Sequence, residues 1–186
     1  MNLPNLLTSV RFILVPFMTG FLISRNYTIA IFLYVLASIS DVLDGYIARK
    51  YNIVTDLGKF LDPIADKVLV ASALIIMLVP VGGVEILPDY AGIAVAIILA
   101  RELVVSGFRM VAASKGMVIA ADKSGKIKTF VTDIAIVVLL VAAEFTGLYG
   151  LANIVGLVLL GIATLLTIIS GTECIVKNRA VLKDAK

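Results

Sequence analysis

Four aspartates between residues 41 and 66 are the side chains of this sequence best able to do chemistry. Asp41 and Asp44 are three residues apart, and Asp62 and Asp66 are four apart, so each pair lies on one face of a helix. Each pair also adjoins a long apolar segment, where acidic side chains are costly and usually functional. We therefore interpret them as a site rather than as solvated charges at helix ends.

The residue types around this cluster indicate the kind of site. Carboxylates crowded into a low-dielectric region need counter-charges, which bound cations supply. The chain has no histidine, and its one cysteine, Cys174, lies in a distant apolar stretch where a buried, inert thiol is expected. Oxygen ligands alone favour Mg²⁺, Mn²⁺ or Ca²⁺ over zinc. Two such ions about 3.5–4 Å apart form a clamp suited to phosphoryl transfer.

The composition predicts the elements that must position these aspartates. The chain has 186 residues, of which 61% are hydrophobic, against roughly 45–50% in soluble proteins. We expect an all-α integral membrane protein with a single domain over residues 1–186. A bilayer-spanning helix needs roughly 20 apolar residues. Six segments qualify, at about 8–24, 28–49, 59–80, 89–113, 127–146 and 150–175, and the short N-terminal segment before them is expected to lie along the membrane interface.

Lysine and arginine positions predict the orientation of these spans. If the N-terminus is cytoplasmic, the cytoplasmic segments hold nearly all the basic residues, whereas the opposite side holds Arg25 with Glu85, Asp89 and Glu144. We therefore expect a multi-pass protein of the cell membrane with both termini cytoplasmic. The second and third spans are antiparallel neighbours, which brings the four aspartates together at the cytoplasmic boundary. The net charge of +3 favours contact with lipid head groups and not with nucleic acid.

The spacing of the aspartates extends into a longer pattern, Asp41-x2-Asp44-Gly45-x2-Ala48-Arg49-x8-Gly58-x3-Asp62-x3-Asp66. This pattern resembles the full signature of the CDP-alcohol phosphotransferases. Four further segments are similar to the bacterial phosphatidylglycerophosphate synthases of that family: residues 5–11, 61–67, 100–102 with Arg109, and 125–129.

The resemblance implies a reaction and a set of metal ligands. CDP-diacylglycerol and sn-glycerol 3-phosphate would give phosphatidylglycerophosphate and CMP on two Mg²⁺ or Mn²⁺ ions. Asp41, Asp44 and Asp62 would hold the first ion. Asp41, Asp62 and Asp66 would hold the second, and Asp66 would also act as the general base. The resemblance also implies a homodimer with its active site facing the cytoplasm.

Residues on the donor side follow from the same resemblance. We expect Gly45 and Ala48 to leave room for the cytidine, although small residues there can also serve helix packing. Asn5 and Thr8 would offer hydrogen bonds, with helix capping as the alternative. Arg49 is the predicted partner of the pyrophosphate.

A phosphorylated acceptor needs cations, and we expect Arg101, Arg109, Lys126 and Lys128 to supply them. Arg101 follows a long apolar run, where a charge is costly unless it is paired or binds an anion. The structural alternative is that it pairs with an acid: Glu102 of a second subunit, Asp133 or Glu173.

Two further readings stay open. The acceptor could be phosphatidylglycerol, inositol phosphate or serine, of which serine needs no phosphate pocket. A different class of protein, a divalent-cation transporter, could use the same four aspartates as its ion site. Transporters often show inverted repeats or broken helices near mid-membrane, and the sequence shows neither.

Overall fold

The computed structural model describes residues 3–50, 56–81, 83, 85–117, 119, 123–145, 149–179 and 181, without the side chains of residues 3–8, 42, 44–50, 56–63, 123 and 149. Over these residues the chain is all-helical, as predicted. The helices are α1 (Leu3–Ile23), α2 (Tyr27–Lys50), α3 (Asp56–Leu78), α4 (Ala91–Ser114), α5 (Lys123–Glu144) and α6 (Tyr149–Lys177).

Each of the six predicted apolar segments forms one of these helices, with its ends shifted by a few residues. The largest shift is at the N-terminus, where α1 begins at Leu3 instead of near residue 8. Residues 3–7 therefore continue directly into the first predicted span. The interfacial position of this segment stays a prediction.

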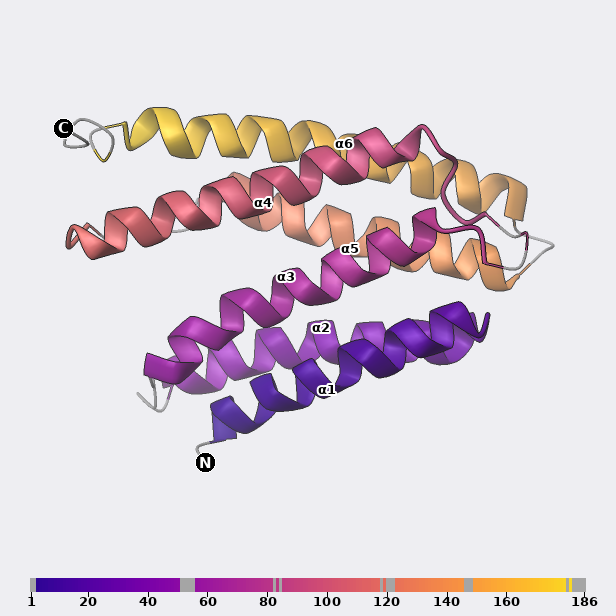
Figure 1. The fold of residues 1–186 in the computed structure, drawn as a ribbon, viewed down its shortest axis with the longest axis horizontal. Coiled ribbons are helices and arrows are strands. Elements are labelled where there is room, and N and C mark those ends of the chain that lie inside the picture. The colour runs from indigo at the N-terminus through magenta and orange to yellow at the C-terminus, as the bar shows by residue number, and fades with distance from the viewer. Residues whose placement is uncertain are drawn as a thin grey trace.

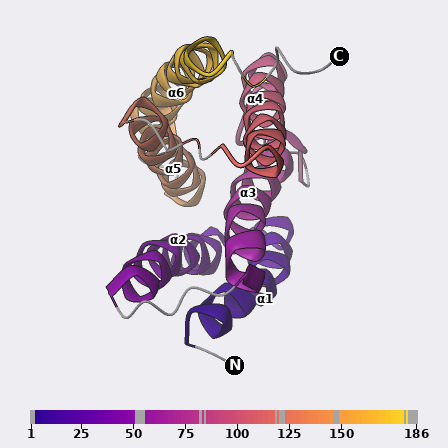
Figure 2. The same cartoon turned by 90° about the vertical axis from the view of Figure 1, so that its left-hand side faces the viewer.

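The helices run roughly along one common direction and form a ring when viewed from one end (Figures 1 and 2). Around the ring, α1 packs on α2, α2 on α5, α5 on α6, α6 on α4, α4 on α3, and α3 on α1. The beginning of α1 and the end of α6 lie at the same end of the bundle (Figure 1). The end of α2 and the beginning of α3 lie there as well, so this end collects the predicted site residues.

Local sequence explains the turn between α1 and α2. Arg25 adopts a left-handed backbone with φ of 58° and ends the first helix. Asn26 then begins the second, because its side-chain Oδ1 accepts a hydrogen bond from the backbone N–H of Ile29 at 3.3 Å. Asparagine is among the best residues for this capping role. At the end of α4, Gly116 has φ of 74°, and the N–H of Met117 returns to the carbonyl of Ala112.

The bundle is apolar both inside and outside. Its core includes Met18, Tyr34, Leu74 and Leu139, all fully buried, and Cys174 is buried as predicted. Large apolar side chains also cover the outer surface, and Leu151 on α6 is 74% exposed. Helices α4 and α6 are long and apolar enough to cross a membrane. So much exposed apolar surface is not expected of a soluble monomer and fits a lipid bilayer.

Candidate functional site

The carboxylate half of the site lies where the end of α2 meets α1. Asp41 Oδ1 forms an ion pair with Arg11 Nη1 at 2.8 Å. The Arg11 side chain is fully buried, whereas the Asp41 side chain is 40% exposed. A buried guanidinium requires such an anionic partner. The ion pair with Arg11 therefore fixes the position of Asp41 and leaves part of its carboxylate accessible.

Asp66 adds a second carboxylate from α3. Its charge interacts with those of Asp41 on α2, Lys67 on α3, Arg11 on α1 and Glu102 on α4. The charges of Asp41 and Asp66 thus influence each other, and the convergence of all four aspartates stays a prediction. The interaction with Glu102 also connects Asp66 with the charged residues on α4.

Several predicted site residues lie in segments for which the structure describes only the backbone. These are the metal ligands Asp44 and Asp62, and the donor-side residues Asn5, Thr8, Gly45, Ala48 and Arg49. Their backbones belong to α1, α2 and α3 at the end of the bundle that holds Asp41 and Asp66. Among the described side chains, no three acidic or cysteine residues converge as metal ligands.

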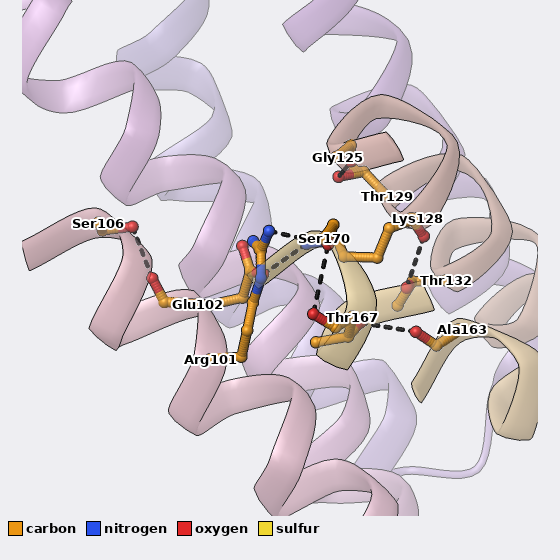
Figure 3. Close-up of polar contacts among 10 residues, drawn as sticks. All are labelled: Arg101, Glu102, Ser106, Gly125, Lys128, Thr129, Thr132, Ala163, Thr167 and Ser170. Atoms are coloured by element: carbon orange, nitrogen blue, oxygen red, sulfur yellow. Dashed lines mark hydrogen bonds and ion pairs between the residues drawn. The ribbon is translucent and has the colours of Figure 1, made fainter. Parts of the chain in front are cut away.

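A cluster of charges on α4 and α5 forms the other half of the site (Figure 3). Glu102 Oε1 accepts hydrogen bonds from Arg101 Nη1 at 2.9 Å and from Lys128 Nζ at 2.5 Å. All three side chains are largely buried, with Lys128 only 6% exposed. Lys128 also interacts electrostatically with Asp66. Glu102 thus holds together two cations from different helices.

Helix α6 supports this cluster from the side. Arg101 Nη2 donates a hydrogen bond to Ser170 Oγ at 2.9 Å (Figure 3). Next to it, a Cβ added to Gly171 would lie 2.9 Å from Arg101 Cγ, closer than such atoms approach in proteins. Four nearby hydroxyl groups donate hydrogen bonds to backbone carbonyls of their own helices. These are Ser106, Thr129, Thr132 and Thr167.

The structure separates the four predicted acceptor cations. Arg101 and Lys128 share Glu102, whereas Lys126 is exposed two residues away, on another face of α5. Arg109 lies eight residues beyond Arg101, or about 12 Å along α4 by the helical rise. The Nε of Arg109 is buried without a hydrogen-bond partner among the described residues.

The acids weighed as partners of Arg101 also have definite contacts. Arg101 pairs with Glu102 of its own chain. Asp133 instead accepts a hydrogen bond from the hydroxyl of Tyr34 at 2.7 Å, and Glu173 accepts one from Ser124 at 3.2 Å. Arg101 therefore has an acidic partner, but this is Glu102 of its own subunit, shared with Lys128, and not one of the three acids considered.

A cavity of about 440 Å³ lies between α2 and α5. Tyr34 and Asp133 contribute polar groups to it, and Asp133 interacts electrostatically with Asp66 and Asp41. The rest of its lining is mainly apolar and includes the exposed side chains Ile39, Leu43, Phe130 and Ile134. The cavity therefore connects the outer apolar surface with Asp133.

Comparison with known proteins identifies the family of this chain. A family model described as CDP-alcohol phosphatidyltransferase matches residues 1–169. The chain belongs to this family. A family member from Rickettsia felis is 42% identical over 173 residues, covering 91% of each chain. One from Bacillus subtilis is 38% identical over 202 aligned positions, covering 99% of this chain and 98% of its own. Both are named CDP-diacylglycerol–glycerol-3-phosphate 3-phosphatidyltransferase.

Divalent metal ions are general to CDP-alcohol phosphatidyltransferases, and the residues here fit them. Asp41 and Asp66 offer oxygen atoms in one region, and the Asp41 carboxylate is partly exposed. Oxygen donors of this kind suit a hard divalent cation.

Sequence reasoning left several residues of this family member without a role. Arg11 and Glu102 are charges inside apolar segments, and that signal alone marks them as paired or functional. The contribution of Ser170 and Gly171 had no comparable signal. A serine and a glycine in an apolar helix are ordinary packing residues until the neighbouring helix is known.

Proposed function

We propose that this chain transfers the phosphatidyl group of CDP-diacylglycerol to sn-glycerol 3-phosphate, giving phosphatidylglycerophosphate and CMP. The names of its relatives support this choice. The observation that carries it is the cation pair Arg101 and Lys128, held together by Glu102. A phosphate-bearing acceptor requires such a pair, whereas serine does not.

In the proposed reaction, the acceptor hydroxyl attacks the phosphorus that carries the diacylglycerol. A new P–O bond forms, the P–O bond to CMP breaks, and CMP leaves from the opposite side. Asp66 takes the proton of the hydroxyl. Arg101 and Lys128 bind the acceptor phosphate and so hold the hydroxyl near Asp66. Positioning and charge compensation are the main sources of catalysis in such transfers.

Asp41, Asp44, Asp62 and Asp66 would hold two Mg²⁺ or Mn²⁺ ions. When bound, these ions neutralise charge on the transferred phosphoryl group and on the leaving oxygen. Arg11 has a separate task in this proposal, because its ion pair fixes the Asp41 carboxylate from the side of α1. The nucleotide roles of Asn5, Thr8, Gly45, Ala48 and Arg49 are part of the same proposal.

The cavity between α2 and α5 is proposed to receive an acyl chain of the donor. Its lining is largely apolar, it borders exposed apolar side chains, and Asp133 within it interacts with Asp41 and Asp66. A donor lipid must keep its chains in the bilayer while its phosphorus reaches the carboxylates. An apolar cavity beside those carboxylates meets both requirements.

The same proposal places all six helices across the cell membrane. The site end of the bundle then faces the cytoplasm with both termini, and residues 1–186 act as one domain in a homodimer. The support is the apolar outer surface together with the concentration of basic residues at the site end. Arg109 and Lys126 stay candidate contacts for phosphate, and Lys126 is exposed enough to meet lipid head groups.

The test is a purified-enzyme assay in detergent micelles with CDP-diacylglycerol and Mg²⁺. CMP release and phosphatidylglycerophosphate should both require glycerol 3-phosphate. Serine, inositol phosphate and phosphatidylglycerol serve as competing acceptors, and a preference for any of them would overturn the assignment. No CMP release with any acceptor would instead favour the transporter reading, which flux measurements in proteoliposomes would examine.

A further inference from the structure

The side chain of Arg101 is held at several points along its length. Near its base, Cγ passes over Gly171 of α6, where an added Cβ would lie 2.9 Å from Cγ and 3.2 Å from Nε. At its end, Nη1 contacts Glu102 and Nη2 contacts Ser170, each at 2.9 Å. A long and otherwise flexible cation is thereby confined to one direction (Figure 3).

Two glycines of α6 closely approach a neighbouring side chain: Gly156 packs on Leu139, whereas Gly171 packs on Arg101. Gly161, ten residues earlier on the same helix, has nothing within 4 Å of an added Cβ. The contact at Gly171 involves Cγ, which is close to the α4 backbone and cannot move far. A methyl group at position 171 would therefore turn Arg101 into another rotamer or separate α4 from α6.

Glu102 fixes Lys128 in the same arrangement. One oxygen, Oε1, accepts from both Arg101 and Lys128, so the two cations stay close despite their mutual repulsion. Two positive charges with one negative charge leave a net positive cluster. This cluster still attracts a phosphate group, and the side chains of its two cations are already oriented before the phosphate binds.

We propose that Glu102 and Gly171 are positioning residues for the acceptor: they set the direction in which Arg101 and Lys128 present their charges to its phosphate. This inference rests on the proposed function, because it concerns binding of a phosphorylated alcohol at the same site. Neither residue needs to touch the acceptor. Preorganised cations bind an anion without first losing side-chain freedom, and a misplacement of about 1 Å is enough to weaken such a site.

The first test is Gly171→Ala, which adds one methyl group and changes no charge. We expect the Michaelis constant for glycerol 3-phosphate to rise about ten-fold, as for the loss of one charge-assisted hydrogen bond. The constant for CDP-diacylglycerol should stay unchanged. Gly161→Ala is the matched control on the same helix, and both constants should stay at wild-type values there.

The second test is Glu102→Gln, which keeps a similar shape and an acceptor oxygen but removes the charge that holds the two cations together. We again expect a higher Michaelis constant for glycerol 3-phosphate alone. An unchanged or lower Michaelis constant for glycerol 3-phosphate would overturn the positioning role of Glu102. The carboxylate would then have no effect on acceptor binding, or would only repel the phosphate. This variant also decides the matter if Gly171→Ala does not yield folded protein.

Failure of this inference is distinguishable from failure of the proposed function. If the wild-type protein does not use glycerol 3-phosphate, the proposed function is wrong regardless of the variants. If the wild-type protein uses it and both variants keep its kinetic constants, only the positioning role is wrong. Equal losses toward both substrates, with a lower melting temperature in detergent, would mean that Glu102 and Gly171 serve stability alone.

Discussion

Two lysines on α5 offer a direct test of the acceptor site. Lys128 is nearly buried and lies 2.5 Å from Glu102 Oε1, whereas Lys126 is exposed. They are two residues apart and therefore point to different sides of one helix. Replacing each with methionine removes the charge and keeps an unbranched side chain. We expect Lys128→Met to impair use of glycerol 3-phosphate and Lys126→Met to leave it nearly unchanged.

The expected sizes follow from burial. A hydrogen bond to a charged group contributes about 1.5–3 kcal/mol, so loss of Lys128 should raise the Michaelis constant for glycerol 3-phosphate roughly ten- to a hundred-fold. An exposed charge such as Lys126 contributes about 0–1 kcal/mol, which corresponds to less than about five-fold. Lys128→Met should not unfold the protein, because Glu102 keeps its contact with Arg101.

The assay measures initial rates of CMP release while glycerol 3-phosphate and CDP-diacylglycerol are varied separately. Thermal unfolding in detergent shows whether either variant is damaged. The acceptor assignment requires an effect confined to Lys128 and to glycerol 3-phosphate. Equal effects of the two substitutions would refute the reasoning from burial. A raised Michaelis constant for CDP-diacylglycerol in Lys128→Met would place that lysine on the donor side.

Further predictions concern the carboxylates, the metal ions and the donor. Asp62→Asn should abolish transfer in a protein that still folds, and substantial activity in it would contradict the two-metal scheme. Excess EDTA should stop turnover, Mg²⁺ or Mn²⁺ should restore it, and zinc should not be needed; full turnover in EDTA would disprove this. Arg11→Met should remove the cation that pairs with Asp41 and lower the melting temperature in detergent, by less than for a fully buried pair because the Asp41 side chain is 40% exposed; an unchanged melting temperature would speak against a stabilising ion pair. Ile39→Trp at the cavity should raise the Michaelis constant for CDP-diacylglycerol alone, whereas equal kinetics would show that no acyl chain lies there.

Much of this fold was predictable because each helix carries a strong local signal. An apolar run long enough to cross a bilayer identifies each helix, and charges or glycine-rich turns mark its ends. The aspartate spacing likewise predicts Asp41 and Asp66 at one end of antiparallel helices, and the charge of Asp41 does act on Asp66. These inferences use only contacts within a helix or across a short loop.

Contacts between distant helices were harder to predict. Arg11 lies on α1 and its partner on α2, and Ser170 lies on α6 opposite an arginine of α4. Which side chains meet depends on how each helix is rotated about its axis, and the largely apolar helices here give little indication of that. The different environments of Lys126 and Lys128 could, however, be predicted from the sequence, because helical periodicity alone puts them on different faces.

The charge arrangement explains how one site accommodates an anionic acceptor beside several carboxylates. A phosphorylated alcohol is repelled by Asp41 and Asp66 unless positive charge compensates. Arg11 cannot provide that charge to the acceptor, because it is fully buried and paired with Asp41. Arg101 and Lys128 can, since Glu102 holds them together and neutralises only one of their two charges. The acceptor phosphate would then bind at the cations, and its hydroxyl end would extend toward Asp66, whose charge interacts with those of Lys128, Glu102 and Asp41.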